Sequence, residues 1–294
     1  MDKNNLGIIL AGGTGTRLYP FSSYINKHLL PLYDKPILDY AISNMIMLDI
    51  DNVLILSDIE TIKILKKRYS NLEKFGIKIK YTIQNEAKGI PEIFKLEAEY
   101  IYKFKKICLH LGDNFFYGSN LFSLLKENFK NFKSSKIFTY SVENTWDYGI
   151  LELNENKLPK KITEKPINTN SKRAITGLYF FENDVIEKSK KLKISKRGEL
   201  EITDILNSYL KEKKLTFIDL PRGSTWYDAG SPKRLIEVSE FVSMIEKRQG
   251  LKIGCIEEIC FRKKLISKKD LKKIINQYPN SEYKYYLENV LNEN

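Results

Sequence analysis

The chain has 294 residues, of which 42% are hydrophobic, and its formal net charge is +12. This apolar content is enough to bury a large core, and no apolar run is long enough to cross a bilayer. The three cysteines show neither a disulfide framework nor metal-ligand spacing, and only His28 and His110 could add imidazole ligands, which argues against a zinc centre. We expect a cytoplasmic protein without a signal segment or a membrane partner.

The basic residues are spread along the whole chain. Most of the lysines lie between apolar residues at helical spacing, as on a solvated helix face. The sequence has no recognisable nucleic-acid-binding motif and no cluster of aromatic and basic residues, so we expect no nucleic-acid partner. Steep, salt-sensitive binding to DNA would be the evidence for the opposite view. The positive field would instead help to attract small anionic molecules.

Strand-like and helix-like segments alternate in the first half of the chain. Apolar or alternating segments predict strands at residues 6–11, 52–57, 78–84 and 107–111. Amphipathic segments between them predict helices at residues 37–48, 59–69 and 91–102. This β-α-β order predicts a parallel sheet flanked by helices.

The pattern changes after about residue 138. Strands are predicted at short intervals, at residues 136–142, 149–153, around Ile162 and at 175–181, which indicates an antiparallel extension of the sheet. Helices at residues 184–192, 202–211 and 232–248 and a strand at 215–220 follow. The predicted fold class is therefore α/β: a Rossmann-like, mixed and mainly parallel sheet flanked by helices, with C-terminal helices. We expect residues 1–240 to form this core and residues 241–294 a C-terminal helical segment.

A glycine-rich turn follows the first predicted strand. Gly12, Gly13 and Gly15 would let the backbone approach a phosphate closely, and successive N–H groups can bind an anion. The turn fits neither the dinucleotide fingerprint, because Leu18 occupies the third glycine position, nor the P-loop, because Gly-Lys-Ser/Thr is absent. Glycine turns alone are common. Two nearby cations, Arg17 and Lys27, favour a phosphate site over a plain turn.

The segments around this turn resemble the nucleotidyltransferases that make NDP-sugars, and most closely the glucose-1-phosphate thymidylyltransferases. The resemblance starts with residues 12–20 and 27–36 and continues in the same order over nearly the whole chain. The further matching blocks are Leu111-Gly112-Asp113-Asn114, Tyr148-Gly149, Glu164-Lys165-Pro166, residues 175–180, residues 197–204 and Trp226-Tyr227-Asp228-Ala229-Gly230.

The resemblance implies magnesium-dependent transfer of a nucleotidyl group from dTTP to glucose 1-phosphate, with release of pyrophosphate. Such a transfer needs charge neutralisation and in-line positioning more than a strong base, since a sugar phosphate is already ionised. Asp113 and Asp228 are implied to hold the Mg²⁺ ion, which prefers oxygen ligands. The implied catalytic residues are Arg17, Lys27, Asp113, Lys165 and Asp228.

The resemblance also implies two sets of binding residues. The nucleotide would be bound by Leu10, Gly12, Gly13, Gly15, Thr16, Arg17, Gln84 and Gly89. Gln84 offers the donor and acceptor pair that a pyrimidine edge can use. The sugar phosphate would be bound by Asn114, Tyr148, Gly149, Glu164, Lys165 and Ile175.

One segment departs from the family pattern. Pro91, Glu92 and Ile93 stand where the thymidylyltransferases usually have Ala, Gln and Ala. Glutamate lacks the N–H donors of glutamine and would bring an anion near the bound nucleotide. UTP, CTP and other sugar 1-phosphates therefore stay open as substrates, as does a catalytically silent paralogue that binds a nucleotide. The C-terminal part, from Phe241 on, implies a homo-oligomer, a dimer or a tetramer.

Overall fold

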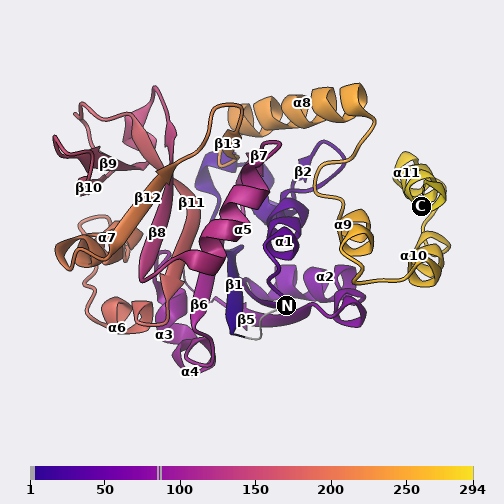
Figure 1. Cartoon of the computed structure of the whole chain (residues 1–294), viewed down its shortest axis with the longest axis horizontal. Coiled ribbons are helices and arrows are strands. Elements are labelled where there is room, and N and C mark those ends of the chain that lie inside the picture. Colours follow the sequence, from indigo (N-terminus) through magenta and orange to yellow (C-terminus); the bar gives the residue numbers. More distant parts are fainter. Residues whose placement is uncertain (1–3, 85, 87, 294) are drawn as a thin grey trace.

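The computed structural model describes residues 4–84, 86 and 88–293 (Figure 1). Residues 1–3, 85 and 87 of the predicted core, and residue 294 of the predicted C-terminal segment, lie outside the described residues. The centre of the molecule is a nine-stranded sheet with helices on both faces. The predicted fold class is confirmed.

The parallel part of the sheet comes from the first half of the chain. Its spatial order is β6-β1-β4-β5, and every neighbouring pair is parallel. The strands are β1 (Asn5–Leu10), β4 (Asn52–Ser57), β5 (Lys78–Ile83) and β6 (Lys106–Leu111), and the connecting helices are α1 (Ile37–Met47), α2 (Ile59–Arg68), α3 (Glu92–Leu96) and α4 (Ala98–Ile101). The chain leaves β1 toward β4 and β5 and then returns to the other side of β1.

The predicted helix at residues 91–102 is two short helices. α3 and α4 meet at Glu97, which has φ −118° and ψ 25°. The Glu97 carboxylate accepts hydrogen bonds from Lys80 and from Thr82 Oγ1 on β5, the latter at 2.7 Å. The break thus coincides with a side chain that is tied to the sheet.

The antiparallel extension is built around β11. This strand pairs in antiparallel fashion with β6, β8 and β9, and β9 pairs with β10, as predicted. The last strand of the sheet, β12, runs parallel to β8. The bounds are β8 (Ser135–Ser141), β9 (Gly149–Leu153), β10 (Pro159–Glu164), β11 (Arg173–Glu182) and β12 (Leu215–Asp219).

Alternate residues of each central strand enter opposite cores. On β4, Val53 and Ile55 pack with α1, while Leu54 and Leu56 pack with the cluster that contains α3. This two-residue period is that of a strand buried on both faces. The first core also contains α5 (Leu121–Asn131), and the second contains α6 (Val185–Lys190) and α7 (Ile202–Lys211).

A small two-stranded sheet lies beside the main one. β7 (Asn114–Tyr117) pairs in antiparallel fashion with β13 (Thr225–Asp228), although 107 residues separate the end of one from the start of the other. Helix α8 (Pro232–Gln249) follows and covers a third cluster that contains Phe115 and Ala229 (Figure 1). A second small pair joins β2 (Pro31–Leu32) to β3 (Lys35–Pro36).

The C-terminal helices pack at one end of the molecule, next to α1 and α2 (Figure 1). They are α9 (Ile256–Arg262), α10 (Lys268–Ile275) and α11 (Glu282–Asn292). Glu257 on α9 accepts hydrogen bonds from Tyr278 and Tyr283 and pairs with Arg68 of α2 at 3.7 Å. No helix in the described residues is long and apolar enough to span a membrane.

Three elements, β7, its partner β13 and α5, are not among those predicted from the sequence. Leu121, Leu125 and Phe129 are buried at a spacing of four residues, which is the pattern of an amphipathic helix. β7 is only four residues long and depends on a partner strand from far along the chain. Short 3-10 helices complete the structure at Thr16–Leu18, Phe21–Ser23, Lys27–Leu29, Leu72–Phe75 and Thr145–Asp147.

Candidate active site

The candidate site lies at the carboxyl ends of β1 and β6. The chain runs to opposite sides of the sheet from these two strands, which is the topological position where open α/β sheets bind ligands. A cavity of about 520 Å³ opens there. It is lined by every site residue predicted from the sequence: Leu10, Gly12, Gly13, Gly15, Thr16, Arg17, Lys27, Gln84, Gly89, Asp113, Asn114, Tyr148, Gly149, Glu164, Lys165, Ile175 and Asp228.

The glycine turn presents free backbone donors to the cavity. Within the described residues, the N–H groups of Gly12, Gly13, Thr14 and Gly15 have no hydrogen-bond partner. Gly13 and Gly15 have positive φ angles of 103° and 59°, a region that glycine enters without a steric cost. Successive unpaired N–H groups form an anion-binding concavity, so this turn can hold phosphate oxygens.

Asp113 follows β6 and is paired with a lysine. Lys27 Nζ donates to Asp113 Oδ2 at 2.5 Å, and Asn114 Nδ2 donates to Asp113 Oδ1 at 3.0 Å. Burial alone would raise the pKa of the Asp113 carboxyl, but Lys27, His28 and these hydrogen bonds together hold the pKa well below its usual range. Asp113 is therefore an anion at neutral pH although it is only 8% exposed.

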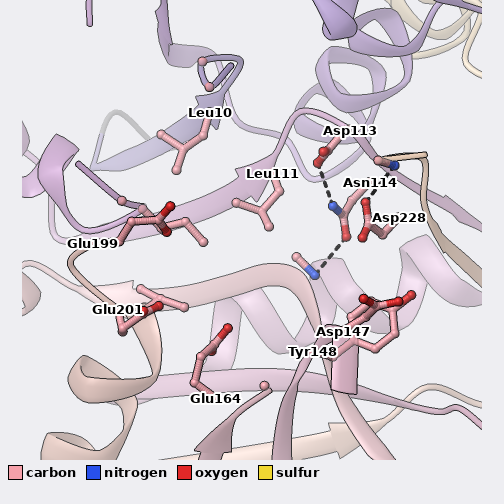
Figure 2. Close-up of a pocket in the computed structure, with 18 of the residues that line it drawn as sticks. Leu10, Leu111, Asp113, Asn114, Asp147, Tyr148, Glu164, Glu199, Glu201 and Asp228 are labelled. Atoms are coloured by element: carbon pink, nitrogen blue, oxygen red, sulfur yellow. Dashed lines mark hydrogen bonds between the residues drawn. The ribbon is translucent and has the colours of Figure 1, made fainter. Parts of the chain in front are cut away.

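Asp228 is brought next to Asp113 by the pairing of β13 with β7. Asp228 lies opposite Asn114 in the register, and Ala229 N donates to Asp113 O at 2.9 Å. Figure 2 shows the two aspartates at the same end of the cavity. Burial, and then repulsion from Asp113, raise the pKa of Asp228. Two close carboxylates of this kind attract a cation.

Asp228 is also held by two arginines. Arg234 Nη1 donates to its Oδ2 at 3.2 Å, and Arg17 Nη2 lies 3.9 Å from the same oxygen. The other side of Arg234 pairs with Asp147, and its guanidinium lies over the Tyr148 ring, 5.3 Å from the ring centre. Arg234, in the first turn of α8, thus connects Asp228 to the loop that carries Tyr148.

Asn114 uses its whole side chain within the protein. Its Oδ1 accepts hydrogen bonds from Trp226 Nε1 at 2.7 Å and from Gly177 N at 3.1 Å, and its Nδ2 donates to Asp113. The residue is 2% exposed. The geometry therefore shows Asn114, the first residue of β7, joining β7 to β11 and β13, in addition to lining the cavity.

The opposite wall comes from β9, β10 and β11. Gly149 on β9 pairs with Glu164 on β10, and Lys165 N donates to Tyr148 O at 2.9 Å, so these residues lie side by side. Lys165 has φ 42°, an unusual conformation for a residue with a side chain, and its Nζ has no hydrogen bond or ion pair to a described residue. Burial, and then repulsion from Glu201, raise the pKa of Glu164.

Gln84 and Gly89 lie on the third side, beyond the end of β5. Gln84 N donates to Ser57 O at 2.9 Å, and its side-chain oxygen lies against Gly12, where an added Cβ would be 2.2 Å away. Gly89 has φ 103°, and an added Cβ there would lie 2.2 Å from the Leu200 carbonyl oxygen. Only glycine permits this close approach of two loops.

Several cavity residues were not predicted. Arg197 pairs with Glu164 at 3.4 Å and Glu201 at 3.3 Å, and Glu199 lies beside them. Glu199 and Glu201 lie far from Asp113 in Figure 2. These residues belong to the matching block at 197–204, which could have indicated them. Asp147 also lines the cavity, and its pairing with Arg234 has no comparable signal, since 87 residues separate the two.

The chain is similar to known proteins over nearly its whole length. Residues 6–244 match the nucleotidyl transferase family. The chain is 38% identical to a glucose-1-phosphate thymidylyltransferase of Neisseria meningitidis over 285 residues, which is 97% of this chain and 99% of that protein. It is also 38% identical to the enzyme of that name from Mycolicibacterium smegmatis, over 97% of this chain and 98% of that protein.

Solved structures share the fold. A Bacillus anthracis structure assigned to a glucose-1-phosphate thymidylyltransferase in complex with sucrose superposes with a TM-score of 0.73 and 33% identity, covering 81% of this chain and 94% of that chain. A UDP-glucose pyrophosphorylase at 22% identity shares the fold, with a TM-score of 0.71. The family match over most of the chain and the full-length similarity lead to one conclusion: this chain belongs to the nucleotidyl transferase family and is a nucleotidyltransferase.

Proposed function

We propose that the enzyme transfers a nucleotidyl group from dTTP to glucose 1-phosphate, with magnesium, and releases pyrophosphate. The observation that carries this proposal is the meeting of Asp113, Asp228, Lys27 and Arg17 at one end of a cavity. A glycine turn lies on one side of these residues and an unpaired lysine, Lys165, on the other. The names of the relatives from Neisseria and Mycolicibacterium support the choice of dTTP and glucose 1-phosphate.

The triphosphate is expected to bind at the glycine turn. The unpaired N–H groups of residues 12–15 would donate to its phosphate oxygens, as such turns do elsewhere. Arg17 is half exposed and its only close carboxylate among the described residues is Asp228, at 3.9 Å, so its guanidinium is available to the phosphates. Lys27 is less free, because it already donates to Asp113.

The sugar phosphate is expected on the opposite wall. The unpaired Lys165 ammonium would bind its phosphate, and Glu164 would accept hydrogen bonds from sugar hydroxyls. A phosphate oxygen of the sugar then attacks the α-phosphorus, a new P–O bond forms, and the bond from the α-phosphorus to the pyrophosphate oxygen breaks. No proton has to leave the attacking oxygen, so the residues act by positioning and charge.

The residues at the aspartate end fit a magnesium ion. Two carboxylates, Asp113 and Asp228, are adjacent, and their repulsion is relieved only in part by Lys27 and the arginines. Within the described residues no group of three or more His, Cys, Asp or Glu side chains could hold a metal alone. Mg²⁺ suits such a partial site because it takes its other ligands from water and substrate phosphates. When bound, the ion would neutralise charge on the phosphates.

The first test is pyrophosphate release by the purified protein with Mg²⁺. It compares dTTP, UTP, CTP, ATP and GTP against a panel of hexose 1-phosphates. Release with dTTP and glucose 1-phosphate is the expected result. Release with another pair alone would keep the chemistry and correct the substrates. A folded protein that binds a nucleotide but gives no release with any pair would instead be a silent paralogue.

A homo-oligomer, dimer or tetramer, remains part of this proposal. Ile236 and Met244 on α8 are 59% and 61% exposed, and large exposed apolar side chains on one helix are common at subunit contacts. Light scattering coupled to size-exclusion chromatography gives the mass directly. A monomer at micromolar concentration would contradict the expectation.

A further inference from the structure

Gln84 presents two chemically different ends at the nucleotide side of the cavity. Its Nε2 donates to Glu92 Oε2 at 2.6 Å. Its Oε1 lies against Gly12 and has no hydrogen-bond partner among the described residues. Gln84 lines the cavity and Glu92 does not. The amide therefore turns its oxygen, an acceptor, toward the ligand side and its NH₂ group away from it.

Glu92 is fixed in place behind Gln84. It starts helix α3, whose next two residues, Ile93 and Phe94, are fully buried on the sheet. Phe94 packs edge to face on Phe181, with 5.9 Å between ring centres. Glu92 Oε2 also accepts from Lys88 N at 3.4 Å, and Glu92 N donates to Gly89 O at 3.2 Å. The carboxylate thus has a defined position.

The chemistry of a carboxylate determines which way the Gln84 amide points. An ionised carboxylate only accepts hydrogen bonds, so the neighbouring amide must offer it the NH₂ group. A glutamine at position 92 could offer either an oxygen or an NH₂ group, and Gln84 could then take either orientation. The anion that the sequence places near the nucleotide is also a support for Gln84.

The surroundings of Gln84 suit a base rather than a phosphate. Three apolar residues of one cluster also line the cavity: Leu10 and Leu56, at the carboxyl ends of β1 and β4, and Ile90, between β5 and α3. The cations Arg17 and Lys27 lie with the two aspartates. An apolar slot with one neutral amide can bind a flat heterocycle and read its edge.

We infer that Glu92 is a positioning residue that makes Gln84 a fixed acceptor, so that the enzyme selects pyrimidines with an N3–H donor over cytosine. Thymine and uracil carry a hydrogen on N3 and can donate to Gln84 Oε1. Cytosine has a lone pair on N3, which would face another acceptor. This inference rests on the proposed function, since it assumes that the cavity binds a pyrimidine nucleotide.

The test measures binding and turnover with nucleotides that have matched sugars. Dissociation constants for dTTP and dCTP, and separately for UTP and CTP, are measured by calorimetry with the full chain. The wild-type protein should prefer dTTP to dCTP, and UTP to CTP, by on the order of 10- to 100-fold, because one buried polar contact is lost and left unpaired. Equal affinities within each pair would overturn the inference without any variant.

Glu92→Gln is the decisive variant. It should reduce the ratio of dTTP affinity to dCTP affinity by about tenfold, mainly through tighter dCTP binding. The reason is that Gln84 becomes free to turn its NH₂ group to cytosine N3. The matched control is Glu97→Gln, one turn further along, whose carboxylate is bound to Lys80 and Thr82 and not to Gln84. The control should leave the ratio unchanged.

A second variant tests whether Glu92 acts through the orientation of the Gln84 amide. Gln84→Ala should lower the ratio of dTTP affinity to dCTP affinity toward one. Adding Glu92→Gln to the Gln84→Ala variant should then leave this ratio unchanged. The inference would be overturned if Glu92→Gln left the ratio of dTTP affinity to dCTP affinity unchanged. It would also be overturned if the control Glu97→Gln lowered this ratio as much as Glu92→Gln does. Absence of pyrophosphate release from the wild type with every substrate pair would contradict the proposed function instead, while the binding ratios would still decide the role of Glu92.

Discussion

Lys27 and Asp113 form an ion pair within the protein. Lys27 Nζ lies 2.5 Å from Asp113 Oδ2, so the ammonium is bound to a carboxylate that is itself proposed to bind the metal. Arg234 does the same for Asp228. Substrate and metal therefore have to compete with interactions inside the protein, and the unpaired Lys165 is the exception. The affinity for substrate and metal therefore depends on the free energy needed to break these ion pairs.

Replacing either aspartate by asparagine tests the shared metal site. Asp113→Asn and Asp228→Asn keep the shape but remove a charge, so the Mg²⁺ concentration for half-maximal rate should rise and the rate should fall by on the order of 100-fold. Pyrophosphate release is measured across Mg²⁺ concentrations. Asp219→Asn is the control, because Asp219 pairs with Arg173 outside the cavity. Near wild-type turnover of both variants at limiting Mg²⁺ would disprove the shared site.

The pKa of Asp228 predicts the pH dependence of metal binding. Because burial and Asp113 raise this pKa, Asp228 takes up a proton at a higher pH than an ordinary aspartate. A protonated carboxyl binds Mg²⁺ poorly, so apparent metal affinity should fall as the pH is lowered. The rate of pyrophosphate release is measured as a function of pH at two Mg²⁺ concentrations. At the higher Mg²⁺ concentration, the fall in rate on the acidic side should occur at a lower pH. An acidic limb that does not move would exclude this proton competition.

Gly12→Ala tests the contact between the glycine turn and Gln84. The new Cβ would lie 2.2 Å from Gln84 Oε1, the end of a flexible side chain that can move away. Stability should change little, whereas dTTP affinity should fall about tenfold because Gln84 loses its position. Calorimetric titration and thermal unfolding provide the two readouts. An unchanged dissociation constant would mean that Gln84 does not need its place against Gly12.

At the scale of elements, β7 and β13 complete the site. β7 extends directly from the end of β6, and β13 reaches it from 107 residues further along the chain. Asn114 joins these strands to β11 through Trp226 and Gly177. The side chain of one residue thus ties together the strands next to the two aspartates.

Asn114→Ala should be strongly destabilising. It leaves two buried donors, Trp226 Nε1 and Gly177 N, without their acceptor, which should cost about 2–5 kcal/mol of unfolding free energy. Urea unfolding gives the value. The control is Asn128→Ala on α5, whose side chain donates to Leu124 O and accepts from Lys136 on the surface; its cost should stay below about 1 kcal/mol. A similar loss of unfolding free energy in the two variants would contradict the role of Asn114 in joining β7, β11 and β13.

The sequence predicts the elements whose signal is local. The parallel strands follow from their apolar runs, and the glycine turn follows from its composition and its place after β1. All predicted site residues line one cavity. Those of the first half meet because loops at the carboxyl ends of parallel strands share one edge of the sheet, whereas the antiparallel strands β9, β10 and β11 supply the opposite wall. The Asp147–Arg234 pair and the Gln84–Glu92 contact depend on how distant or irregular segments fold together, and no residue spacing indicates them.

For the whole molecule, the two histidines connect stability to pH. Both are buried: His28 next to Lys27, and His110 between Asn44 and the Leu111 carbonyl. Burial, and for His28 also repulsion from Lys27, lowers the pKa of His28 to about 3 and burial lowers that of His110 to about 4. The folded chain therefore keeps both rings neutral at pH 5.

Acid should accordingly destabilise the protein at an unusually high pH. Since the folded pKa values lie below the unfolded value, the unfolded state binds more protons between about pH 6.5 and 4, and each ring should remove about 2 kcal/mol of stability from pH 7 to pH 5. His28→Gln should remove about half of this loss. Urea unfolding at pH 7, 6 and 5 measures it. An equally steep loss in His28→Gln would show that His28 is not responsible.

The long separation of β7 and β13 also determines when activity can arise during synthesis. After residue 114 leaves the peptidyl-transferase centre, 114 more residues must be added before residue 228 exists, which takes about 6–23 s at bacterial to eukaryotic rates of translation. During that time the nascent chain has the glycine turn, Lys27 and Asp113 but no Asp228, and the aromatic β7 has no partner strand. A ribosome therefore carries the first carboxylate of the proposed metal site well before it carries the second.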